Sequence, residues 1–159
     1  MKKKAGFTLI EVLIAMIILA VGLLGLAGLQ ATSLRNNQRA YNRSVATQLA
    51  YEMADRMRAN YTHAKNLAGN VYITTSPPTA AAVTNCTSTA GCVPAAMAQN
   101  DLYDWNQAIQ SSLPGTVASP VTGIITIAGN VFTITINWDD NRDGKVDNND
   151  PNFQVSFQL

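Results

Sequence analysis

The hydrophobic and polar positions of the chain begin with one long apolar run. Residues 12–29 contain no charged side chain and none more polar than methionine. Eighteen such residues in a helix reach the length needed to cross the hydrocarbon core of a bilayer, which is about 30 Å thick. The pattern therefore predicts a membrane-spanning helix close to the N-terminus.

The helical pattern continues over residues 30–60, where it becomes amphipathic. Apolar residues recur there at the spacing of one helix face, namely Leu34, Val45, Ala46, Leu49, Ala50, Met53, Ala54 and Met57. The opposite face carries Arg35, Arg39, Arg43, Gln48, Glu52, Asp55 and Arg58. No proline precedes Pro77. We therefore expect one continuous helix whose second half packs one face against a domain.

The last third of the chain alternates apolar and polar residues, which is typical of strands with one buried face. Residues 124–128 are mostly β-branched, and Gly129-Asn130 supplies a two-residue turn. Two alternating segments follow, with Phe132, Ile134, Ile136 and Trp138 in one, and Phe153, Val155, Phe157 and Leu159 in the other. The amphipathic part of the helix can cover the apolar face. The sequence thus predicts an α+β fold, with a long N-terminal helix packed on a small antiparallel sheet.

The middle of the chain offers fewer apolar residues. Residues 71–75 fit a short strand that Pro77-Pro78 would end, because proline cannot donate to a ladder. Residues 101–109 fit a short helix with Asp101 as its N-cap. Trp105 lies on the apolar face of that helix, so we expect it to be a packing anchor.

Composition and charge exclude several functional classes. The chain has 159 residues and a net charge of +1, so it has room for the helix and one small domain, and it offers no basic surface for nucleic acid. The only histidine, His63, has no evident catalytic partner, and no nucleophile or phosphate-binding arrangement is recognisable. We expect no enzymatic activity and no small-molecule substrate.

A single carboxylate, Glu11, stands at the start of the apolar helix. Such a group costs roughly 2.5–3.5 kcal/mol inside a membrane unless it is paired. A secretory signal usually has a shorter apolar core and a cleavage site of small residues, and a plain single-span anchor would leave Glu11 unexplained. A helix that packs beside copies of itself allows a neighbour's cation to approach. Three lysines at positions 2–4 should remain cytoplasmic.

The segment Gly6-Phe7-Thr8-Leu9-Ile10-Glu11 resembles the class III signal of type IV pilins and of type II secretion pseudopilins. The resemblance implies that a prepilin peptidase cleaves after Gly6 and methylates the new amino terminus at Phe7. It also implies that Glu11 pairs with a neighbouring subunit's amino terminus during assembly.

The resemblance divides the chain into four parts. Residues 1–6 are the leader, and residues 7–29 are the half of the helix that spans the inner membrane and later forms the filament core. Residues 30–60 are the amphipathic half, and residues 61–159 form an extracytoplasmic head. The head would be periplasmic before the subunit enters the extracellular pilus.

Four later segments are similar to PilV-type minor pilins, also called type IV pilus modification proteins. They are residues 54–60, 101–105, 113–115 and 135–140. This resemblance implies a structural subunit that initiates or primes pilus assembly, with other minor pilins and the major pilin as partners, in fimbrial biogenesis and through it motility or adhesion. The alternatives are a minor pseudopilin of type II secretion and a membrane-anchored, calcium-dependent binding or adhesion module.

Two cysteines, Cys86 and Cys92, lie in a polar segment of the expected extracytoplasmic part. Cysteines in such compartments form disulfides, so we predict a Cys86–Cys92 bond. Two free buried thiols are the alternative.

An acidic loop over residues 139–150 matches the calcium-loop pattern of EF-hands in register and resembles the loops of dockerins. Gly144 falls at the glycine position, and the expected ligands are Asp139, Asn141, Asp143, the carbonyl of Lys145, Asp147 and Asp150. Asp150 stands where the pattern has glutamate, and strands rather than helices should flank the loop. A calcium (Ca2+) site and a solvated hairpin loop, built from ordinary turn residues, both fit this sequence.

Overall fold

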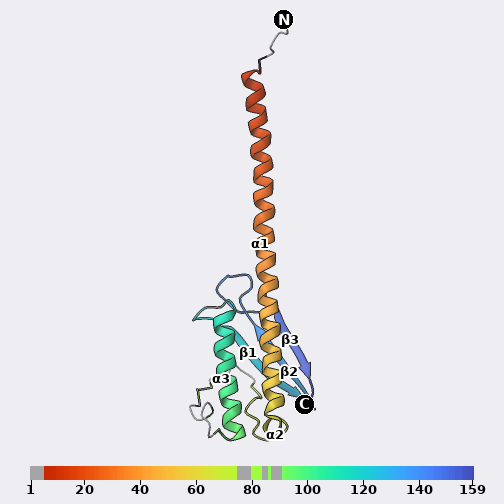
Figure 1. Ribbon diagram of the computed structural model, residues 1–159, viewed down its shortest axis with the longest axis vertical. Helices are drawn as coiled ribbons and strands as arrows, with labels where there is room; N and C mark the ends of the chain where they lie inside the picture. Colours follow the sequence, from red (N-terminus) through yellow and green to blue (C-terminus); the bar gives the residue numbers. More distant parts are fainter. Residues whose placement is uncertain (1–5, 75–79, 84–85, 87–90) are drawn as a thin grey trace. The chain divides into compact units, whose positions relative to one another are not determined.

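The computed structural model describes residues 6–74, 80–83, 86 and 91–159 (Figure 1). The elements in chain order are α1 (Leu9–Ala59), α2 (Tyr61–Ala64), α3 (Pro94–Ser112), β1 (Thr122–Ala128), β2 (Val131–Asn137) and β3 (Asn152–Phe157). A long N-terminal helix with a three-stranded antiparallel sheet confirms the predicted α+β, pilin-like fold. Two compact units make up the chain, Met1–Ala40 and Tyr41–Leu159.

The first unit consists of the start of α1. Every described residue from Gly6 to Ala40 is exposed, including the whole apolar run. Of the helices in the described residues, α1 is the one that is long and apolar enough to cross a membrane, and none of its most apolar window is buried. The core helix of a soluble protein would be mostly buried, so this exposed apolar surface needs lipid or other subunits to cover it.

The second unit is built on the sheet, whose strand order is β1-β2-β3. Gly129 has a φ of +60° in the turn between β1 and β2, a conformation that glycine adopts without a steric penalty. Along β2 the burial alternates, as the sequence pattern predicts. Phe132 of β2 pairs with Phe157 of β3, and their stacked rings have centroids 5.8 Å apart.

One hydrophobic core joins the last part of α1, α3 and the sheet. The buried residues of α1 are Asn42, Ala46, Leu49, Ala50, Met53, Ala54 and Met57. This set confirms the predicted apolar stripe from Ala46 onward, whereas Leu34 is 69% exposed. Figure 1 shows α3 running beside this part of α1, with the strands behind both helices.

The predicted position of the second helix was wrong at its start. Helix α3 begins at Pro94 rather than at Asp101, and Val93 is its N-cap. Proline is favoured at the first helical position because its missing N–H is not needed there, and the alanines that follow are strong helix formers. Asp101 therefore lies inside α3, where its buried carboxylate makes tertiary contacts rather than a cap.

The strand predicted at residues 71–75 is also wrong within the described residues. Val71 and Tyr72 form a turn, and only Thr74 makes a β-bridge, with Ile125 of β1. Tyr72 is directed into the core, with 0% of its surface exposed, which explains the apolar pattern without a strand. Thr75 and the two prolines at 77 and 78 lie outside the described residues.

Trp105 is a packing anchor, as predicted. It is 1% exposed, and its indole Nε1 donates a hydrogen bond to the carbonyl of Leu49, at 2.9 Å. The ring also lies against Gly123 of β1. Through this one side chain, α3 is fixed both to α1 and to the sheet.

Candidate functional site

The first turn of α1 carries the candidate site. Thr8 immediately precedes the helix, and its carbonyl accepts hydrogen bonds from the backbone N–H groups of Glu11 and Val12, at 3.2 and 3.4 Å. The Glu11 carboxylate reaches back to the backbone N–H and the hydroxyl of Thr8, at 3.4 and 3.5 Å. This is half of a capping box, in which an acid at the third helical position satisfies a free donor at the N-cap.

The charge of Glu11 also suits this position, because helix N-termini carry a partial positive charge that stabilises carboxylates. Glu11 is nevertheless exposed, so its carboxylate retains room for a further donor. A carboxylate has about four lone-pair sites, and Thr8 engages one oxygen. The geometry therefore allows Glu11 to cap its own helix and to accept an ammonium group from outside.

Gly6 and Phe7 lie just before the helix. Neither residue is helical, and both are exposed, with Phe7 at 86%. The peptide bond between them is therefore in irregular, accessible backbone, as a proteolytic site requires. The leader residues before Gly6 lie outside the described residues.

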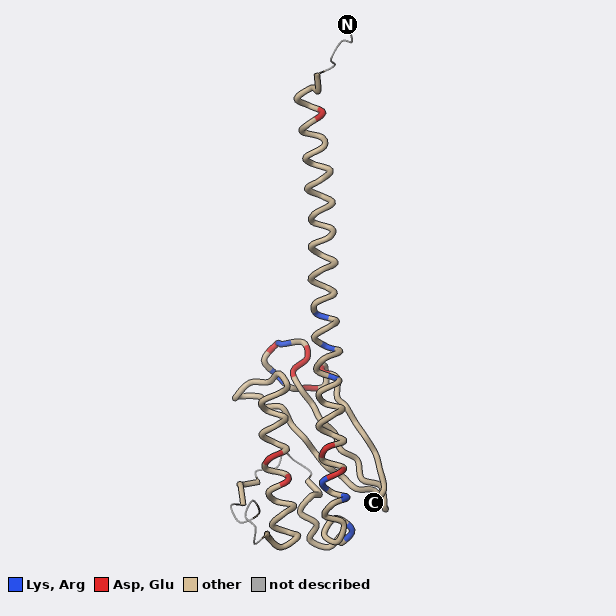
Figure 2. Tube along the Cα trace, in the orientation of Figure 1, with Lys and Arg blue, Asp and Glu red and all other residues tan. Residues whose placement is uncertain are grey.

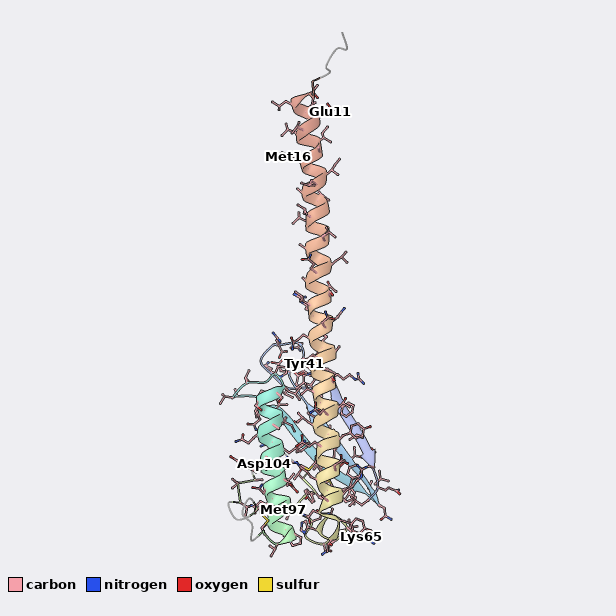
Figure 3. The ribbon with its side chains drawn as sticks, viewed as in Figure 1. Glu11, Met16, Tyr41, Lys65, Met97 and Asp104 are labelled. Atoms are coloured by element: carbon pink, nitrogen blue, oxygen red, sulfur yellow. A yellow bond between two sulfur atoms is a disulfide. The ribbon has the colours of Figure 1, made fainter. Side chains whose placement is uncertain are left out.

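An apolar hollow adjoins Glu11 on the surface of α1. Besides Glu11 itself, its lining residues are Phe7, Val12, Ala15, Met16 and Leu19. Ala15 lies one helical turn after Glu11, and its small side chain leaves this face of the helix open. Figure 3 shows Glu11 and Met16 on the exposed start of α1. A second apolar helix could pack here and bring a cation against the carboxylate.

In the second unit, a polar cluster ties the end of α1 to α3. The Arg56 guanidinium donates to Glu52 at 2.8 Å and to Asp101 at 3.2 Å. The other oxygen of Asp101 accepts a hydrogen bond from the Tyr72 hydroxyl, at 2.5 Å. Asn60 donates to that hydroxyl at 3.1 Å and to the carbonyl of Pro94 at 2.8 Å.

The environment of this cluster changes two proton affinities. Burial and the hydrogen bond to Asp101 raise the pKa of Tyr72 well above its ordinary value. Partial burial disfavours the charged form of Arg56, but the hydrogen bonds and charges of Glu52 and Asp101 outweigh it and raise the pKa of Arg56. Tyr72 thus remains a neutral donor and Arg56 a cation. The cluster is a structural joint rather than a source of protons.

The predicted disulfide is present. Cys86 and Cys92 are bonded, with Cα atoms 4.8 Å apart. The loop that they close is short, so its contribution to stability is at most about 2–3 kcal/mol in the chain-entropy model. Cys92 lines a small hollow with Arg56, Asn60 and Pro94, which places the bond beside the polar cluster.

The acidic loop is held by its own carboxylates. Asp139 is 4% exposed and accepts hydrogen bonds from the backbone N–H groups of Asp143 and Gly144, at 3.1 and 3.0 Å. Asp150 accepts from the backbone N–H groups of Asp140 and Asp147, at 3.0 and 3.1 Å. Asp139 and Asp150 occupy the first and last positions of the predicted calcium pattern. Their carboxylates therefore hold the loop in its conformation through hydrogen bonds to its own backbone.

The remaining predicted ligands lie further out. The side-chain oxygen of Asn141 accepts from the N–H of Asp143, at 2.7 Å, and Asp143 accepts from the N–H of Lys145, at 2.9 Å. Asp147 accepts from the N–H of Asn149, at 2.7 Å. Across residues 6–74, 80–83, 86 and 91–159, no three His, Cys, Asp or Glu side chains gather as a metal would require. The calcium site stays a prediction, since the pattern also uses an amide and a carbonyl oxygen.

Sequence reasoning missed two features of these sites. The first is the role of Thr8 as the N-cap of α1. The spacing Thr-x-x-Glu before an apolar run is the sequence signal that could have shown it. The contact of Arg56 with Asp101 was not readable, because it joins residues that are 45 positions apart. Arg56 adjoins the polar face of the helical pattern, and nothing local indicated that a carboxylate from α3 would meet it.

A capped, exposed apolar helix that leads into a small α+β head defines the architecture of a pilin-like, membrane-anchored subunit. Comparison with protein families agrees with it. Residues 1–27 match the prokaryotic N-terminal methylation motif, and residues 28–103 match the family described as Type IV pilin Tt1218. Together the two matches cover residues 1–103 and support a type IV pilin. Searches of curated proteins and of solved structures found no match.

The two family matches bear on the function and the location of the chain. Type IV pilins are structural proteins rather than enzymes, and they assemble with other pilins into a pilus. The methylation motif and the exposed apolar helix fit a membrane-anchored subunit. The polar cluster and the disulfide belong to the scaffold of the head.

Proposed function

We propose that this chain is a PilV-type minor pilin that initiates or primes assembly of the type IV pilus. Its N-terminus would face the cytoplasm and its head the periplasm, until the subunit passes from the inner membrane into the filament. The observation that carries the proposal is the first turn of α1, where the accessible Gly6–Phe7 bond immediately precedes the Thr8 N-cap that the Glu11 carboxylate contacts.

The assembly step follows from charge. Cleavage after Gly6 would free an amine at Phe7, and a subunit that approaches along the apolar hollow would bring its own amine to Glu11. In a low-dielectric environment an ammonium and a carboxylate attract strongly, and each removes the cost of the other's burial. This attraction stabilises a neighbouring subunit only when that subunit is in the correct axial register.

The PilV-type assignment is supported by contacts between segments that carry the resemblance. Arg56, in the first such segment, donates to Asp101, in the second. The backbone N–H of Asp139, in the fourth, donates to the carbonyl of Pro114, in the third, at 3.0 Å. The four segments therefore contact one another in two pairs within the head. These contacts give a structural reason for the four segments to occur in the same chain.

Mass spectrometry of sheared surface filaments tests the proposal. We expect a peptide that begins at methylated Phe7, in much smaller amount than the major pilin. We also expect surface pili to disappear when the gene is deleted and to return on complementation. An intact lysine leader on the mature protein would contradict the proposal.

A minor pseudopilin of type II secretion is the second candidate, because it shares the N-terminal signal. In that case deletion would abolish protein export and leave surface pili intact. Calcium-dependent ligand binding by the head would instead favour an adhesion module.

A further inference from the structure

Between the acid at the start of α1 and Glu52, the only charged residues are three arginines. Residues 12–51 contain no Asp, Glu or Lys, and their cations are Arg35, Arg39 and Arg43. All three are exposed, and they are four residues apart, which places them along one side of the helix. Figure 2 shows these basic turns of α1 directly after its uncharged stretch.

The distance of each arginine from the apolar run can be derived from the helical rise. At 1.5 Å per residue, Arg35 lies about 9 Å beyond Leu29, Arg39 about 15 Å and Arg43 about 21 Å. The polar headgroup layer on each side of a bilayer is roughly 5–8 Å thick. The Cα–Cβ bonds of a helix tilt toward its N-terminus, so these side chains lean back toward the apolar run.

The turn between the apolar run and the first arginine marks the boundary with the headgroups. The hydroxyl of Thr32 donates to the carbonyl of Gly28, at 3.1 Å, so this turn satisfies its own polar group without water. Beyond it, a long side chain with a charged tip can extend its stem along apolar surface and place the charge in the headgroup layer. Arg35 reaches that layer readily, and Arg39 reaches it when extended.

We propose that Arg35 and Arg39 form an arginine collar that binds the phosphates of phospholipid headgroups in the leaflet opposite the leader. The guanidinium group is suited to this ligand, since its planar array of donors matches phosphate oxygens. Arg43 lies beyond the layer and is not part of the collar. The inference rests on the membrane-anchored state of the chain and not on the proposed priming role.

The collar gives the anchored subunit a fixed depth. Before processing, the leader lysines and the arginine collar hold opposite faces of the membrane. Once the leader is removed, the collar is the remaining cationic attachment at the end of the apolar run that faces away from the new Phe7 amine. Extraction into a filament then requires the collar to exchange lipid phosphates for other partners, so anionic lipid should retain the subunit in the membrane.

Solid-state NMR on the full chain tests the collar. The protein, with arginine labelled by ¹³C, is reconstituted in phosphatidylglycerol and phosphatidylcholine vesicles in phosphate-free buffer, and dephasing of arginine Cζ by ³¹P is measured. The chain has six arginines, so we expect about one third of the Cζ signal to dephase. The double variant Arg35→Gln/Arg39→Gln should lose this component.

Arg43→Gln is the control, because it removes an arginine charge from the same exposed side of the helix, one turn beyond the collar. It should leave the dephased component unchanged. Absence of dephasing in the unsubstituted protein overturns the proposal, as does an equal loss in the Arg43→Gln variant. If the arginines instead meet carboxylates of a neighbouring pilin, dephasing is absent and Arg35→Gln weakens self-association, which also overturns it. None of these outcomes depends on pilus assembly, so the priming role is tested separately.

Discussion

The indole of Trp105 lies directly against Gly123, with no room for a side chain between α3 and β1. A Cβ at position 123 would lie 2.5 Å from Cη2 of Trp105 and 2.8 Å from Cδ1 of Ile109. Both neighbours are buried and hold the core together. The glycine is therefore required by the packing of a large aromatic ring.

We expect Gly123→Ala to lower the free energy of unfolding of the head by about 1–3 kcal/mol, the usual cost of overpacking a core. Denaturant unfolding of the detergent-solubilised chain, followed by tryptophan fluorescence, measures the change. Gly25→Ala is the control, since nothing lies within 4 Å of a Cβ there. Equal stability of Gly123→Ala and the unsubstituted protein would show that the ring can move aside.

Tyr72→Phe should destabilise the head by about 1–3 kcal/mol, because the variant leaves the polar partners of a buried hydroxyl unsatisfied. Those partners are one oxygen of Asp101 and the side-chain amide of Asn60. The measurement is the difference in free energy of unfolding near neutral pH. Tyr103→Phe is a suitable control, because the hydroxyl of this half-buried residue of α3 accepts an exposed hydrogen bond from Gln107. A neutral effect would mean that water replaces the hydroxyl.

The same hydroxyl predicts a dependence on alkaline pH. The pKa of Tyr72 is raised in the folded protein, whereas an unfolded tyrosine titrates near pH 10. Its contribution is therefore complete below about pH 10 and is lost as the pH rises toward the folded pKa. The stability difference between the unsubstituted protein and Tyr72→Phe should shrink above pH 10. A difference that stays constant would contradict the raised pKa.

Glu11→Gln separates the two roles of the acid. Glutamine keeps an oxygen that can accept from Thr8 and so preserves the helix cap, but it removes the charge. If Glu11 serves assembly through its charge, Glu11→Gln and Glu11→Ala should both be processed and both enter filaments poorly. Immunoblots of sheared filaments and of membranes give the two amounts. Normal incorporation of Glu11→Gln would assign the residue to capping alone.

The calcium prediction can be sharpened with two aspartates of the acidic loop. Asp139 is buried and holds backbone N–H groups, so Asp139→Ala should lower the melting temperature with or without calcium. Asp143 is exposed, so Asp143→Ala should mainly abolish the rise in melting temperature that calcium is expected to give. Identical melting curves in calcium and in chelator would contradict the calcium prediction. The loop would then be a turn held only by its own hydrogen bonds.

The sequence predicted the elements whose signal is local. The apolar run, the stripe from Ala46 to Met57 and the alternation along β2 each repeat within a few residues, and the structure contains all three. The helix from Pro94 was underestimated because its first turn, residues 94–97, is exposed or half-buried and shows little apolar periodicity.

Contacts between distant segments could not be predicted in this way. Nothing near Tyr72 indicates that its hydroxyl meets Asp101, and nothing near Gly123 indicates that Trp105 covers it. These contacts depend on how α1, α3 and the sheet pack together. The hydrophobic periodicity of one segment carries no information about that packing. Resemblance to a family supplied the significance of Glu11, and the Thr8 contact adds a local reason for the same residue.

The start of α1 at Leu9, rather than at Phe7, bears on the order of events during maturation. A peptidase must draw its substrate into an open conformation, and a scissile bond wound into a helix would first have to unravel. Here the contact between Thr8 and Glu11 caps the helix, which begins two residues after that bond. The bond is therefore accessible to a peptidase without local unfolding of the helix. Under the proposed function, the acid that would recruit a neighbour would also keep the cleavage site accessible, so cleavage could precede docking without a change in the helix.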